Sequence, residues 1–155
     1  MRAEICRRCH TVEECYEFML AYAAQGLPCE DRSQSSNQIR EFLQRAVDAL
    51  SGLADACVAA VNADAPDAAE KYFAFLEVLD RDARDSIRTI ELVLAQSTIS
   101  SQLIDNLNAS LHLRAVLTDL FLLGEIARQQ MQAAIATRSP PACGEPKNHE
   151  KVFAS

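Results

Sequence analysis

"IREFLQRAVDALSGLADACVAAV" (residues 39–61) is the stretch that decides the fold class. Its apolar residues recur at alternating steps of four and three, a spacing that places them along one face of an α-helix. The series is Ile39, Leu43, Ala46, Leu50, Leu53, Cys57 and Ala60, and it is widened on one side by Phe42, Val47, Ala54, Val58 and Val61. We therefore predict one long core-facing helix over residues 36–63.

The same period continues on both sides of this stretch. Upstream, Thr11 and Glu14 form a capping-box pattern that predicts a helix over 12–25, with Val12, Cys15, Met19 and Tyr22 on its core face. Downstream, Pro66 suits the first turn of a helix over 66–97. The serines of "STISS" (97–101) offer caps for a last helix over 101–138. The core positions expected on these two helices are Tyr72, Phe73, Leu76, Leu79, Ala83, Ile87, Ile90 and Leu94, then Ile104, Leu107, Leu111, Leu117, Leu120, Phe121, Met131 and Ile135.

The composition favours helices throughout. Of the 155 residues 49% are hydrophobic, only 4 are glycine and none is tryptophan, which is unlike a turn-rich β fold. Short connections between consecutive helices favour antiparallel packing. We predict an all-α, up-and-down antiparallel helical bundle in a single domain, 1–138, with three long helices, a short N-terminal helix behind a cysteine-containing segment (1–11), and a flexible tail (139–155).

Helix lengths suggest how such a protein would act. At ~1.5 Å per residue the three long helices would span roughly 42–55 Å and the first only about 21 Å. This mismatch predicts an uncovered apolar strip, which would be covered by a second copy in a homodimer or by a helix of a protein partner. The alternative is a closed three-helix bundle with the first helix lying across one end.

Charge and apolar patterning argue against several classes of protein. The formal net charge is -7 and no predicted helix is basic along one face, so we expect no nucleic-acid or membrane binding. The most apolar stretch, 111–127, is interrupted by Arg114, Asp119 and Glu125 and predicts a core helix rather than a membrane span. No secretory signal is evident at the N-terminus, which favours a cytoplasmic protein.

"EICRRCHTVEEC" (residues 4–15) is the one cluster with the chemistry of a site. Cys6 and Cys9 have the two-residue spacing that lets two thiolates hold one metal ion, and His10 or Cys15 would add a third ligand. Zinc or an iron–sulfur cluster is therefore a candidate cofactor, with Cys6, Cys9, His10 and Cys15 as its ligands. Because a second Cys-x-x-Cys pair is absent, a redox-responsive thiol cluster and cysteines without a function remain open.

The other cysteines and the motif CRRCH add little to this picture. CRRCH also matches covalent c-type haem attachment, but that chemistry follows export, for which the sequence carries no signal. Cys57 is expected to be a small apolar core residue and Cys143 falls in the tail. Cys29 lies too far along the chain to join the cluster unless a neighbouring subunit brings it close.

Nothing in the sequence predicts catalysis. A di-iron bundle needs Glu-x-x-His pairs that are absent, and there is no Gly-rich phosphate loop or nucleophile elbow. Asp119 and Glu125 are expected to face solvent, and the lone His112 is expected to be solvated or hydrogen-bonded in place rather than to bind a ligand. We predict a small cytoplasmic interaction protein, an adaptor, assembly chaperone or regulator, rather than an enzyme, with a metal-binding or redox-sensing protein as the alternative.

Overall fold

The all-α class is confirmed by the computed structural model, which describes residues 2–26, 34–64 and 69–138. Within those residues every regular element is an α-helix and no strand occurs. The helices are α1 (Arg2–Ala24), α2 (Gln34–Leu50), α3 (Leu53–Asp64), α4 (Ala69–Leu94), α5 (Ser101–Asn108) and α6 (Leu111–Arg138). The tail predicted over 139–155 lies outside the described residues.

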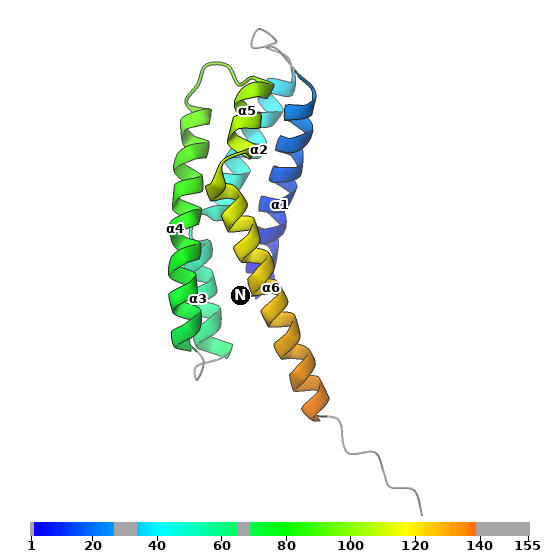
Figure 1. Cartoon of the computed structure of the whole chain (residues 1–155), viewed down its shortest axis with the longest axis vertical. Coiled ribbons are helices and arrows are strands. Elements are labelled where there is room, and N and C mark those ends of the chain that lie inside the picture. Colours follow the sequence, from blue (N-terminus) through cyan, green and yellow to red (C-terminus); the bar gives the residue numbers. More distant parts are fainter. Residues whose placement is uncertain (1, 27–33, 65–68, 139–155) are drawn as a thin grey trace, which may run out of the picture. The chain divides into compact units, whose positions relative to one another are not determined.

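The chain divides into two units, Met1–Leu122 and Leu123–Ser155. The first unit holds α1 to α5 and the start of α6, and the second holds the rest of α6. In the first unit α1 packs along α2 and α5, while α4 packs against α2 and α3 (Figure 1). The core lies between these helices, and its largest fully buried side chains are Val12, Met19, Ile39, Leu43, Leu50, Leu53, Leu76, Leu79, Ile90, Ile104, Leu113 and Val116.

The contact between α1 and α2 combines aromatic stacking with an ion pair. The rings of Phe18 and Phe42 are stacked with their centroids 3.9 Å apart. The Arg45 guanidinium lies 4.9 Å from the Phe42 ring centroid and pairs with the Glu14 carboxylate at 2.5 Å. These contacts join the first helix to the second.

The first helix begins at Arg2, ten residues earlier than the predicted start at residue 12. Its first turns are stabilised by Glu4, whose carboxylate pairs with Arg7 at 2.7 Å and with Arg8 at 2.8 Å, three and four residues on. Thr11 does not cap, because its hydroxyl donates to the Arg7 carbonyl within the helix. The predicted short helix is therefore wrong: α1 has 23 residues against 26 in α4, and the length mismatch does not exist.

The long helix predicted over 36–63 is also divided, at Ser51 and Gly52. Gly52 has φ +73°, a left-handed conformation that ends a helix and that glycine adopts most readily. The Arg8 guanidinium donates to the carbonyl oxygens of Asp48, Ala49 and Ser51 at 3.2, 3.1 and 2.6 Å. An arginine from another helix thus satisfies the carbonyls left open where α2 ends.

Two further predicted boundaries differ from the structure. The helix predicted over 101–138 is interrupted at Ala109 and Ser110, where Ser110 donates its N–H to the Leu107 carbonyl in a tightened last turn. The helix predicted over 66–97 ends at Leu94, three residues early, and its start falls in 65–68, outside the described residues. Phe121, predicted to be a core residue, is 61% exposed.

By length and composition alone, Asn37–Ala63 is the one described run apolar enough to cross a membrane. Core helices of soluble proteins can have the same length and composition. Here the run is broken at Gly52, and it supplies Leu43, Leu50 and Leu53 to the core of the first unit.

Candidate functional site

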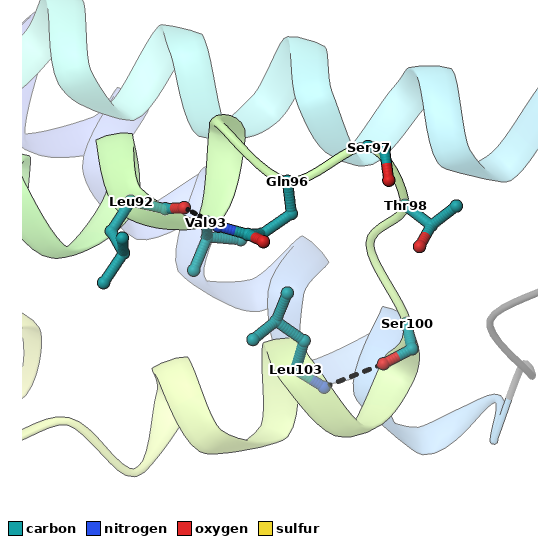
Figure 2. Close-up of a pocket in the computed structure, with 7 residues that line it drawn as sticks. All are labelled: Leu92, Val93, Gln96, Ser97, Thr98, Ser100 and Leu103. Carbon is teal, nitrogen blue, oxygen red and sulfur yellow. Dashed lines mark hydrogen bonds between the residues drawn. The ribbon is translucent and has the colours of Figure 1, made fainter.

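An open pocket of about 490 Å³ lies in the first unit, where α4 ends and α5 begins. Leu92 and Val93 come from the last turn of α4 and Leu103 from the first turns of α5. Figure 2 shows Leu92 and Leu103 projecting from their helices into the same space, with the connecting segment along one side. The remaining lining residues are Gln96, Ser97, Thr98 and Ser100.

The connection that forms this pocket is held by α2. Arg40 donates from its guanidinium to the carbonyl oxygens of Leu94, Gln96 and Ser97 at 2.9, 2.5 and 3.1 Å. These carbonyls lie at the C-terminal end of α4, where the helix dipole favours a positive charge. The same end is tightened by Gln96, whose side-chain amide donates to the Leu92 carbonyl at 2.9 Å.

The other side of the connection is held by α1 and by the cap of α5. The buried Tyr22 hydroxyl donates to the Ile99 carbonyl at 2.7 Å, and the Ser101 hydroxyl donates to the Tyr22 carbonyl at 3.0 Å. Ser100 is the N-cap of α5, where its hydroxyl accepts from the Leu103 N–H at 3.2 Å. Contacts from two other helices therefore fix the shape of the pocket in advance.

The chemistry of the pocket is apolar with an uncharged polar edge. Leu92 is 67% exposed. This is the largest exposed fraction among the exposed large hydrophobic residues in the described part of the chain. No lining residue is titratable at neutral pH. Such a site can receive an apolar side chain and orient it by hydrogen bonds at the edge, but it offers no acid, base or nucleophile of catalytic type.

The four predicted metal ligands all lie on α1, where Cys6, Cys9 and His10 fall within about one turn of one another and Cys15 does not. Cys6 and His10 are exposed, Cys9 is half-buried and Cys15 is fully buried in the core. At ~100° per residue, Cys15 lies on the opposite face of the helix from Cys6. Across the described part of the chain, no group of three or more His, Cys, Asp or Glu side chains is arranged to hold a metal ion. The metal site stays a prediction without support from this arrangement.

The local environment of Cys9, Cys15 and Cys57 disfavours the thiolate form of each, because burial raises its pKa. Burial raises the pKa of Cys9 to about 11, and the thiols of Cys57 and Cys6 add to the rise. Burial likewise raises the pKa of Cys15 to about 11 and raises that of Cys57. Arg7 and Arg8 are engaged by Glu4, and Arg8 by the carbonyls that end α2. Buried thiols of raised pKa are poor nucleophiles at neutral pH.

Two features were missed from the sequence. Cys57 is buried, as predicted, but it lies on α3 close enough to Cys9 to contribute to the raised pKa of that thiol. Asp119 does not simply face solvent, because its Oδ2 is buried with no hydrogen-bond partner among the described residues. Burial and the nearby Asp82 raise the Asp119 pKa, and the buried Ser86 hydroxyl, one turn from Asp82, is also unpartnered within the described structure. No local spacing in the sequence signals either contact, since each joins two helices.

Comparisons of the chain with protein-family models, with curated proteins and with solved structures each found no match. A proposal for function therefore depends on the geometry and chemistry of these residues alone.

Proposed function

We propose that this protein is a small interaction protein, an adaptor, assembly chaperone or regulator, whose α4–α5 pocket receives an apolar side chain of a protein partner. The observation that carries the proposal is Leu92, which is 67% exposed beside an open pocket. Apolar anchors that enter preformed pockets dominate the energy of many protein interfaces. The uncharged polar edge suits the rim of such an interface, where hydrogen bonds give orientation.

The proposed function does not depend on a short first helix, because α1 has 23 residues. We further propose that the helices pack as an antiparallel up-and-down bundle. The proposed function also retains a cytoplasmic location, no resident cofactor and no enzymatic activity. The uncharged pocket and the net charge of -7 are consistent with a protein partner rather than nucleic acid.

A photo-crosslinking amino acid in place of Leu92 tests the proposal in cells that express the protein. We expect a covalent protein–protein adduct, identified by its mass and by peptide sequencing. Val78 is the matched control, because it lies on the same helix, is 42% exposed and does not line the pocket. An adduct yield at position 92 no higher than at position 78 would contradict the proposal.

A second candidate function uses the thiols of the first unit as a metal-binding or redox-sensing site. One feature favours it, namely that Cys57 on α3 lies near enough to Cys9 on α1 to raise the pKa of Cys9, and Cys6 lies one turn from Cys9. The raised pKa of Cys9 works against it, because both metal binding and oxidation need the thiolate. Zinc and iron analysis of anaerobically purified protein tests it, and metal well below one atom per two chains would end it.

A further inference from the structure

Two aspartates of the first unit lie near each other without a positive partner. Burial raises the pKa of the Asp119 carboxyl on α6, and Asp82 on α4 is close enough to raise it further. Within the described residues neither carboxylate makes an ion pair, whereas Asp80 and Asp85, on either side of Asp82 in the sequence, each pair with an arginine about one turn away. The described part of the chain therefore holds a negative pair that none of its side chains neutralises.

Two buried oxygen atoms of this region also lack hydrogen-bond partners. The Oδ2 of Asp119 is buried with no partner in the described structure, and so is the hydroxyl oxygen of Ser86, a residue that is only 1% exposed. Buried polar atoms in folded proteins are almost always paired with protein groups, with ordered water or with an ion. Both oxygens therefore require a partner that the described side chains do not supply.

The position of Ser86 on α4 turns its hydroxyl toward the aspartate pair. Asp82, Ser86 and Val93 are separated by four and seven residues, so at ~100° per residue they lie within about 40° of one another around the helix. Val93 meets Leu103 of α5 in the α4–α5 pocket, which shows that this side of α4 faces the helices that follow it. Ser86 is one turn from Asp82 on that side, where Asp119 of α6 is also found.

From these oxygen atoms we infer a binding site for one divalent cation, Mg²⁺ or Ca²⁺, between α4 and the first turns of α6. The carboxylates of Asp82 and Asp119 and the hydroxyl oxygen of Ser86 are its ligands. All three are hard oxygen donors, which these two cations prefer, and none is the nitrogen or sulfur that zinc or copper favours. A cation in this position neutralises the two carboxylates and provides the missing partner of both buried oxygens.

The number of ligands sets the expected affinity. The site has two carboxylates, fewer than the three His, Cys, Asp or Glu side chains of a fully enclosed metal centre, and no such group of three occurs in the described structure. Asp82 is only half-buried, so water can complete the coordination. We therefore expect an exchangeable cation with a dissociation constant of ~0.1–1 mM rather than a resident cofactor. The inference is independent of the proposed partner and of the α4–α5 pocket.

Isothermal titration calorimetry of the full chain, freed of metal with a chelator and dialysed, measures this binding. MgCl₂ and CaCl₂ are titrated separately, and at least one should bind with one ion per chain. Asp119→Asn removes the buried carboxylate and should weaken binding at least ~10-fold. Asp85→Asn removes the same charge from α4 outside the site and should leave the dissociation constant unchanged.

Ser86→Ala separates a built site from a general attraction of cations to an acidic chain. The substitution removes one ligand without changing the charge, and it should weaken binding at least ~3-fold. Because the hydroxyl has no protein partner in the described structure, the variant without cation should be at least as stable as the wild type. Circular dichroism and the midpoint of thermal unfolding in chelator report that each variant is folded.

Three results would overturn the inference. If neither cation binds the wild-type chain, water rather than a cation partners the buried oxygens. If Asp85→Asn weakens binding as much as Asp119→Asn, the ions respond to net charge and not to a site. If Ser86→Ala binds as tightly as the wild type, the serine hydroxyl is not a ligand and the site is not the one inferred.

Discussion

Arg40 on α2 donates a 2.9 Å hydrogen bond to the carbonyl oxygen of Leu94, the last residue of α4. The two residues are 54 positions apart in the chain, and the same guanidinium reaches the next carbonyls of the connection. One cation therefore both ends a helix and shapes the pocket beside it.

Replacing Arg40 tests this role. Arg40→Ala leaves the carbonyls of the α4 end without their charged donor and should lower the free energy of unfolding by about 1–2 kcal/mol. Arg84→Ala is the control, because Arg84 pairs with Asp80 on the exposed face of α4 and should cost less than ~0.5 kcal/mol. Chemical denaturation measures both, and equal losses would show that the cap contributes nothing particular.

Gly52 is the residue at which the long apolar run turns. Because its φ is +73°, Gly52→Ala should lower the free energy of unfolding by ~1–2 kcal/mol although nothing lies within 4 Å of the added Cβ. Gly124→Ala is the opposite case, since Gly124 lies within α6 at an ordinary helical φ. That variant should be unchanged or more stable by up to ~1 kcal/mol. A stable Gly52→Ala variant would argue against the helix break.

Asp119 should make stability depend on pH in an unusual direction. Burial and Asp82 raise its pKa in the folded state, so the folded chain holds this proton more tightly than the unfolded chain. The neutral carboxyl therefore stabilises the folded chain at pH values below the unfolded pKa of ~3.9. This stabilisation is lost as the pH rises through the pKa of Asp119 in the folded state.

The neutral isostere removes this effect. Asp119→Asn should raise the midpoint of thermal unfolding at pH 7 by ~1–2 °C and give no gain near pH 3. Asp85→Asn is the control, since Asp85 pairs with Arg88 at 2.9 Å and its neutralisation should not stabilise the protein. A gain for Asp119→Asn that is the same at both pH values would contradict the titration.

The cysteines should differ in reactivity according to their burial. Cys6 is exposed, whereas Cys9 is half-buried with a pKa of about 11 and Cys15 and Cys57 are buried. Alkylation by iodoacetamide at pH 7.5, followed by mass spectrometry, should modify Cys6 at least ~10-fold faster than Cys9 or Cys15. The Cys9 rate should still be increasing with pH above pH 9. Fast modification of Cys9 at neutral pH would instead support a reactive thiol.

The sequence determined the helical class and most of the core faces of the first unit. Val12, Cys15, Met19 and Tyr22 are all buried on α1, and Ile39, Leu43, Leu50 and Leu53 are buried on α2 and α3. These predictions succeeded because a helical face is defined by residues three and four positions apart, which a local pattern records. The lengths of the helices were not determined in this way.

Only the tertiary structure decided where helices end and which side chains meet. Arg8 donates to the carbonyls at the end of α2, and Arg40 donates to those at the end of α4. Each arginine belongs to another helix, 40 residues along the chain from Asp48 and 54 from Leu94, respectively. The pocket, the approach of Cys57 to Cys9 and the burial of Asp119 near Asp82 likewise join separate helices. Such contacts depend on how helices pack in space, and no spacing along a single helix encodes them.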